Sequence, residues 1–197
     1  SIDYDKNNDQ HYNLISALHK SLRASDTDAS LYWLARMIIS GEDPNYILRR
    51  LIRFANEDVG LAEPNAIQIS ISSWQAFERL GSPEGELSIA QLVIYLSTCP
   101  KSNSVYKAWK ETLEFTKKNP YNSPPMSILN APTKMMKDLG YGKGYVYDHE
   151  TDNGFSGQNC FPENVIRKTF YHPIERGYER EIKKRLNWWN KLRNLNE

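Results

Sequence analysis

The sequence of 197 residues has few cysteines, no long apolar run and almost no excess of either charge. Its two cysteines, Cys99 and Cys160, do not indicate a disulfide framework and favour a reducing compartment. Apolar runs such as Leu92–Leu96 fall far short of the about 20 residues that span a bilayer, which excludes a transmembrane helix. The start, Ser1–Asp5, has no basic or apolar segment and no initiator Met. We therefore expect no secretory signal, and a fragment of a longer protein.

The charged residues nearly cancel, with 25 Lys and Arg against 24 Asp and Glu and a formal net charge of +1. No global positive field therefore indicates nucleic-acid binding, and a basic surface must be local. The hydrophobic share of 40% and the charged share of 25% are those of ordinary globular proteins. A chain of this length buries a substantial core without metals or disulfides, as one domain or as a principal domain with an appendage.

Motifs for catalysis, cofactors and metals are absent. Gly140–Gly144 is the nearest approach to a phosphate-binding loop, but Lys143 is followed by glycine instead of the Ser or Thr that holds magnesium. The four histidines are not spaced as a zinc site requires, and the acidic run Asp148–Asp152 lacks the closing Glu of a calcium loop. We expect no catalytic residue, no cofactor and no metal in this chain, and nothing in it supports a free-standing enzyme.

Residues 1–120 have the periodicity and the start and stop signals of six helices joined by short connections. Asn8 and Asp9 are candidate caps of a first helix over His11–Leu22, and Ser102 is a candidate cap of the sixth. The other predicted boundaries are Ser25–Asp28 to Gly41, Asp43–Pro44 to Gly60, Glu63–Pro64 to Gly81, and Ser82–Glu84 to Pro100. The pattern predicts a mainly α fold, a helical bundle with residues 1–120 as its principal domain.

Residues 121–197 have a different character and are predicted to form a C-terminal extension. A proline-rich stretch leads to a short helix over Ile128–Leu139, and then to an aromatic, glycine-rich region over Tyr141–Tyr171 that we expect to be irregular. Tyr145–Tyr147 can form a short strand within it. A terminal helix is predicted over Glu175–Asn194.

The terminal helix is the one locally basic element. Its cations interleave with Trp188 and Trp189, so single-stranded nucleic acid can bind there, with bases on the indoles and phosphates on the cations. The candidate contacts are Lys183, Lys184, Arg185, Trp188 and Lys191. The alternative is an amphipathic helix that docks its Trp face on the body and leaves a solvated basic face.

A second charged group lies near Gly60. Glu57 and Asp58 end a predicted helix, where negative charge opposes the macrodipole, so specific partners are expected. Arg49, Arg50 and Arg53 are the candidates, in an internal ion-pair network or across a subunit contact.

Two stretches of the chain resemble a known family. The first includes Ala29-Ser30-Leu31-Tyr32-Trp33-Leu34-Ala35-Arg36-Met37 and Ala55-Asn56-Glu57-Asp58-Val59-Gly60-Leu61-Ala62 within His11–Ala62, and the second includes Asn159–Glu163, Phe170–Pro173 and Gly177–Glu179. Both look like the C-terminal part of the replication-associated recombination protein A family. These AAA+ ATPases are also called MgsA, are similar to the Werner helicase-interacting protein, and are related to clamp-loader subunits.

The resemblance implies that this chain is a helical collar that holds subunits together, as a homotetramer in the family. It implies an ATPase module with ATP and Mg elsewhere in the parent, and action in replication, recombination and repair at stalled forks. Implied partners are other copies, single-stranded-DNA-binding protein and DNA, with a cytoplasmic, nucleoid-associated location and no membrane. The 5 Trp and 12 Tyr agree with an association module, because these residues are favoured at interfaces.

Overall fold

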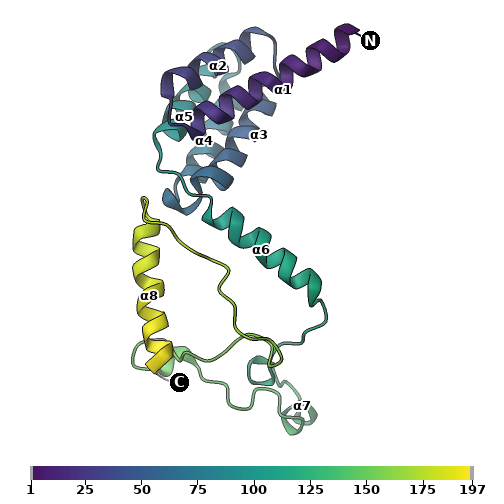
Figure 1. Cartoon of the computed structure of the whole chain (residues 1–197), viewed down its shortest axis with the longest axis vertical. Helices are drawn as coiled ribbons and strands as arrows, with labels where there is room; N and C mark the ends of the chain where they lie inside the picture. Colours follow the sequence, from purple (N-terminus) through teal and green to yellow (C-terminus); the bar gives the residue numbers. More distant parts are fainter. Residues whose placement is uncertain (1, 196–197) are drawn as a thin grey trace. The chain divides into compact units, whose positions relative to one another are not determined.

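The computed structural model describes residues 2–195, with side chains from residue 8 to residue 194. Eight α-helices and no strand form within the described residues, which confirms the mainly α fold. The helices are α1 Ile2–Arg23, α2 Thr27–Ile39, α3 Pro44–Phe54, α4 Ala66–Leu80, α5 Glu86–Thr98, α6 Ser104–Lys118, α7 Lys134–Asp138 and α8 Glu179–Leu195 (Figure 1).

The chain divides into two compact units. The first comprises the chain up to Lys107 together with Ile174–Arg180, and the second comprises Ala108–Pro173 together with the chain from Glu181 onward. In the first unit α1 packs on α2, α2 and α4 pack on α5, and α3 packs on α4.

Short polar side chains start the helices of the first unit much as the sequence predicts. The Asp26 carboxylate accepts a hydrogen bond from the amide of Ala29 at 3.0 Å, and Asp43 accepts one from Asn45 at 2.9 Å, ahead of a first-turn proline. The prediction of Asn8 and Asp9 as caps is wrong, because both lie inside α1. No Pro or Gly interrupts the chain before them, so the helix continues toward the N-terminus.

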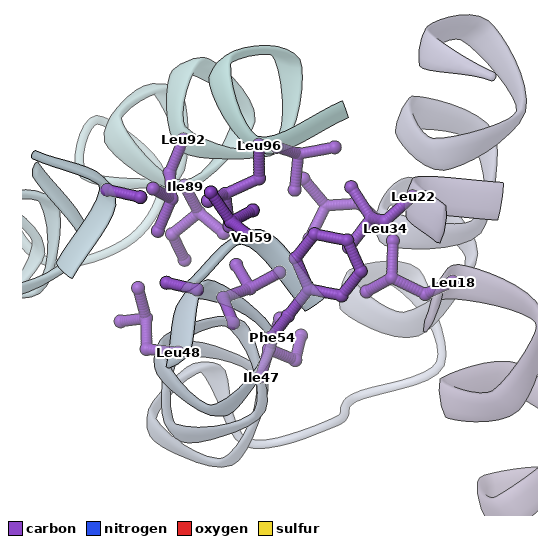
Figure 2. Packing of buried hydrophobic residues seen from close by; sticks show 14 of the residues in the cluster. Leu18, Leu22, Leu34, Ile47, Leu48, Phe54, Val59, Ile89, Leu92 and Leu96 are labelled. Carbon is purple, nitrogen blue, oxygen red and sulfur yellow. The ribbon is translucent and has the colours of Figure 1, made fainter. Parts of the chain in front are cut away.

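The core of the first unit surrounds Phe54, the last residue of α3. Its side chain is fully buried and points toward Leu18 and Leu34, which come from α1 and α2 (Figure 2). Leu92 and Leu96 of α5 close the cluster from another side. The apolar stripes of five helices thus meet at one place, which explains why their sequence periodicity is so regular.

The second unit contains little regular structure outside α6, α7 and α8. The predicted helix over Ile128–Leu139 is only the 3₁₀ turn Met126–Ile128 and the five-residue α7. The predicted strand at Tyr145–Tyr147 is wrong. The side chain of Gln158 takes the place of a partner strand, since its Nε2 donates to the Val146 carbonyl at 2.8 Å and its Oε1 accepts from the Val146 amide at 3.4 Å.

The terminal helix begins at Glu179, four residues later than predicted. The residues before it are held on the first unit, where the Tyr178 amide donates to the Ala62 carbonyl at 2.9 Å and Arg176 donates to the Lys101 carbonyl at 3.1 Å. The fully buried Glu179 accepts a hydrogen bond from the Ile174 amide at 3.1 Å. This segment, Ile174–Tyr178, is called the strap below.

Candidate functional site

One side of α8 packs on the irregular chain of the second unit. The Trp189 indole lies parallel to the ring of Phe155, with centroids 6.4 Å apart. One turn later the Arg193 guanidinium lies over the same ring at 5.2 Å and donates to the Gly157 carbonyl at 2.9 Å. Trp189 and Arg193 therefore hold the helix against the chain around Phe155.

The opposite side of α8 is open. Trp188 is 55% exposed and makes no ring contact or hydrogen bond within the described part of the chain. An open hollow of 580 Å³ follows this side of the helix. It is lined by Lys184, Asn187, Trp188, Asn190, Lys191 and Asn194, a set that we call the Trp188 face.

The structure divides the five predicted nucleic-acid contacts between different parts of α8. Lys184, Trp188 and Lys191 lie together on the Trp188 face, because residues spaced by four and by seven share one side of a helix. Arg185 instead pairs with Glu181 at 3.4 Å, and Lys183 is half-buried away from the hollow. Sequence reasoning missed Asn187, Asn190 and Asn194, although their spacing of three and four residues was a readable signal.

The second predicted cluster surrounds a π-helix, Ala55–Val59, that directly continues α3. Arg53 Nε lies 3.1 Å from Glu57 Oε2 across one turn. Asp58 pairs with Arg23 at the end of α1, with Arg23 Nε 2.7 Å from Asp58 Oδ1. Sequence reasoning missed Arg23, because no pattern within either helix links residues 35 positions apart.

The remaining members of that cluster differ in exposure. Arg49 is exposed and Arg50 is half-buried. His19 lies in the same region at 8% exposure, with its ring against the edge of Phe54 at 5.9 Å. Burial lowers the pKa of His19 to about 4, and the positive charge of Arg50 adds to the effect. His19 is therefore a neutral residue of the core at physiological pH.

The two units differ sharply in burial. The first contains all of the buried apolar cluster around Phe54. In the second unit, among the side chains that are described, Pro125 alone is buried. The exposed large apolar side chains of the second unit are Trp109, Leu113, Tyr121, Met135, Leu139, Tyr145, Val146, Tyr147, Ile166, Trp188 and Trp189.

An apolar hollow of 330 Å³ lies between α2 and α5 in the first unit. Ile38, Ile39 and Ile89 contribute to its walls. Within residues 2–195, no helix is long and apolar enough to cross a membrane. The described side chains include no group of three or more His, Cys, Asp or Glu placed to hold a metal ion.

Comparison with known proteins finds relatives over almost the whole chain. Residues 24–190 match the family described as MgsA AAA+ ATPase C terminal. The chain is 48% identical over 190 residues to replication-associated recombination protein A of Coxiella burnetii, which covers 96% of this chain and 43% of that protein. It is 46% identical over 189 residues to the protein of the same name in Escherichia coli K12, with 95% and 42% covered.

A eukaryotic relative also matches. The chain is 43% identical over 172 residues to ATPase WRNIP1 of Dictyostelium discoideum, which covers 87% of this chain and 20% of that protein. The chain thus spans less than half the length of each of these relatives.

Proposed function

The chain belongs to the MgsA AAA+ ATPase C-terminal family, and we propose that it is the oligomerisation domain of its parent ATPase. In this proposal it joins subunits into a tetramer and carries no ATPase site of its own. The relatives are named for replication-associated recombination and as WRNIP1 ATPase, which supports a parent that acts in replication-fork maintenance, recombination and repair.

The lack of a buried apolar core among the described residues of the second unit is the observation that carries this proposal. Ordering a residue costs about 1–2 kcal/mol of backbone entropy, which globular domains offset by burying apolar surface. The described part of the second unit has eleven exposed large apolar side chains and one buried residue, Pro125. A surface of this kind is typical of chains that complete their burial against other subunits.

The residue types favour the same conclusion. Trp109, Tyr121, Tyr145 and Tyr147 belong to residue types that are enriched at the centres of interfaces, because each buries much area at the cost of few rotatable bonds. Obligate subunit interfaces bury about 2,000 Å² or more. A surface spread over α6 and the glycine-rich chain can supply such an area.

The remaining features of the proposal are supported only by the resemblance to the family. ATP and Mg bind elsewhere in the parent, in the part of the relatives that this chain does not span. The parent's partners are single-stranded-DNA-binding protein and DNA, and it works in the cytoplasm in association with the nucleoid.

Light scattering on this chain tests the proposal directly. At micromolar concentration the measured mass is expected to be about four times the 22.9 kDa of one chain. Dilution should lower the mass reversibly, since association depends on protomer concentration. A folded chain that stays at 22.9 kDa up to high concentration would rule the oligomerisation role out.

A further inference from the structure

We propose that the Trp188 face of α8 binds single-stranded nucleic acid, with a base stacked on Trp188 and phosphates on Lys184 and Lys191. This inference rests on the DNA partner proposed above for the parent, and it places that partner on a surface other than the one that we propose joins the subunits. It assigns a ligand to one side of one helix, where the described residues give no internal partner to the tryptophan.

The first support is the different environment of the two neighbouring tryptophans. Adjacent residues point about 100° apart on a helix, so Trp189 can stack on Phe155 only while Trp188 points elsewhere. Hydrophobic docking of α8 therefore requires one indole and leaves the other 55% exposed. An exposed indole with no packing role is a stacking platform that accepts any base, worth about 1–3 kcal/mol per stacked base.

The second support is the position of the cations. Lys184 lies one turn before Trp188 and Lys191 lies one turn after it, on the same side of the helix. At 1.5 Å per residue their Cα atoms are about 10 Å apart along the axis, the length of about three stacked nucleotides. A short single strand that follows the helix can thus meet both ammonium groups while one of its bases lies on the indole.

The third support is the three asparagines. Asn187, Asn190 and Asn194 line the same hollow, and each carries both a donor and an acceptor. Amides of this kind pair with the edges of unpaired bases, as asparagine does with adenine. They add hydrogen-bonding capacity without adding charge.

The charges argue against other ligands. None of the six residues of the Trp188 face is Asp or Glu, so the same face of a second copy would be repelled. An acidic peptide would pair with Lys184 and Lys191 through its carboxylates. It would not account for three neutral amides around an indole. The combination of indole, amides and cations fits an unpaired nucleic-acid strand best.

The test measures binding of a fluorescein-labelled oligothymidylate by fluorescence anisotropy. The strand should exceed the about 4–16 nucleotides that compact single-strand sites cover. Trp188→Ala is expected to weaken binding about tenfold, whereas Trp188→Phe keeps most of the affinity because a phenyl ring still stacks. The oligonucleotide should also quench less tryptophan fluorescence in Trp188→Phe than in the unmodified chain.

The cations are tested by the salt dependence. The double variant Lys184→Ala with Lys191→Ala should reduce the slope of log affinity against log salt by about 1.4, since each phosphate contact to a single strand contributes about 0.7. The matched control is Lys137→Ala with Lys143→Ala, which removes the same charge from two exposed lysines elsewhere in the second unit. The control pair should leave the slope nearly unchanged.

Four results of the binding measurements would overturn the proposal. The first is an equal change of the salt slope in the two double-lysine variants, and the second is equally tight binding of duplex DNA through the same residues. The third is an unchanged affinity in Trp188→Ala, and the fourth is binding of an acidic peptide without binding of any oligonucleotide.

Light scattering on every variant separates this proposal from the oligomerisation role. Unchanged mass with weakened binding supports the nucleic-acid face, whereas a lower mass in Trp188→Ala would place the face in a subunit contact and overturn it. Circular dichroism and thermal melts confirm that each variant is folded.

Discussion

Arg23 at the end of α1 holds Asp58 in the π-helix, with Arg23 Nε 2.7 Å from Asp58 Oδ1 and Nη2 3.4 Å from Oδ2. The Asp58 side chain is only 12% exposed, whereas the Arg23 side chain is 51% exposed. The backbone carbonyl of Asp58 accepts a hydrogen bond from the Ser102 amide at 2.8 Å. One residue of an irregular helix thus links α1 to the segment that begins α6.

Arg23→Ala is expected to lower the free energy of unfolding by about 1 kcal/mol, because it leaves a largely buried carboxylate without its main charged partner. Asp58 raises the pKa of Arg23, chiefly through their hydrogen bond, so the pair favours the charged arginine. Urea unfolding measures the loss, and a double-mutant cycle with Asp58→Asn gives the coupling of the two side chains.

The Arg53–Glu57 pair is the control for this prediction. It is more exposed and spans one turn of helix, so Arg53→Ala should cost only about 0.3–0.5 kcal/mol. Equal losses in the Arg23 and Arg53 variants would contradict a special role for the link between α1 and the π-helix.

The buried His19 should make stability depend on pH. Its pKa is about 4 in the folded chain, below the ordinary 6.5, mainly because burial disfavours the imidazolium. Between these pH values the unfolded chain binds more protons than the folded chain does. The contribution of His19 to the free energy of unfolding is therefore fully present above pH 6.5 and decreases as the pH falls toward 4. When this contribution is lost completely, the free energy of unfolding is lower by about 3 kcal/mol. Urea unfolding at a series of pH values measures it.

His19→Leu is the variant that isolates this effect. It should remove the fall in stability that His19 causes between pH 6.5 and 4, and at pH 7.5 it should cost no more than about 1.5 kcal/mol. His172→Gln, at an exposed position, is the control and should keep the full pH dependence. A profile of His19→Leu that matches the unmodified chain would show that other groups cause the pH dependence.

The sequence predicts the helices of the first unit well because their signals are local. Asp26 and Asp43 cap the helices they precede, and Gly81 follows the last residue of α4 with a φ of +67°. The buried stripes of α1, α3 and α5, which include Leu18, Leu51 and Leu92 respectively, are also visible in the sequence as a period of 3.6 residues. Each of these features can be recognised from a few neighbouring residues of the sequence.

The missed features depend on contacts between distant positions. The π-helix at Ala55–Val59 has no sequence signal of its own, and Arg23 reaches Asp58 only after α1 has packed. The late start of α8 depends on the strap, whose hydrogen bond goes to the Ala62 carbonyl. On α8 the periodicity could place Lys184, Trp188 and Lys191 on one side, but it could not show that Trp189 is held by Phe155.

Gly177 in the strap should tolerate no side chain. Its φ is +55°, and a Cβ there would lie 2.1 Å from the Ala62 carbonyl oxygen, the same atom that accepts the Tyr178 amide. Gly177→Ala must therefore displace the strap, and we expect a loss of at least about 2 kcal/mol in the free energy of unfolding. Amide hydrogen exchange at Tyr178 should accelerate as that hydrogen bond is lost.

Gly41→Ala provides the matched control. Gly41 has a φ of +82° but nothing within 4 Å of a built Cβ, so the cost is the strain of the backbone alone, about 1 kcal/mol. If the two variants lost equal stability, the close approach to Ala62 would have no energetic consequence.

The two units offer a matched pair of exposed isoleucines that tests where subunits meet. Ile166 of the second unit is 90% exposed, and Ile39 at the apolar hollow of the first unit is 83% exposed. Ile166→Glu introduces a charge into the surface that we infer to be covered by other copies. We expect it to weaken association at least tenfold, about 1.4 kcal/mol, because a buried charge without a partner is costly.

Ile39→Glu makes the same chemical change on a unit that already has its own core. It should leave the mass measured by light scattering unchanged, since the cluster around Phe54 does not require a second copy. The opposite result is dissociation of the Ile39→Glu variant and none of the Ile166→Glu variant. It would place the subunit contact at the hollow between α2 and α5. The comparison is informative because both substitutions add the same charge at nearly equal exposure, so a difference in mass reports the position and not the chemistry of the change.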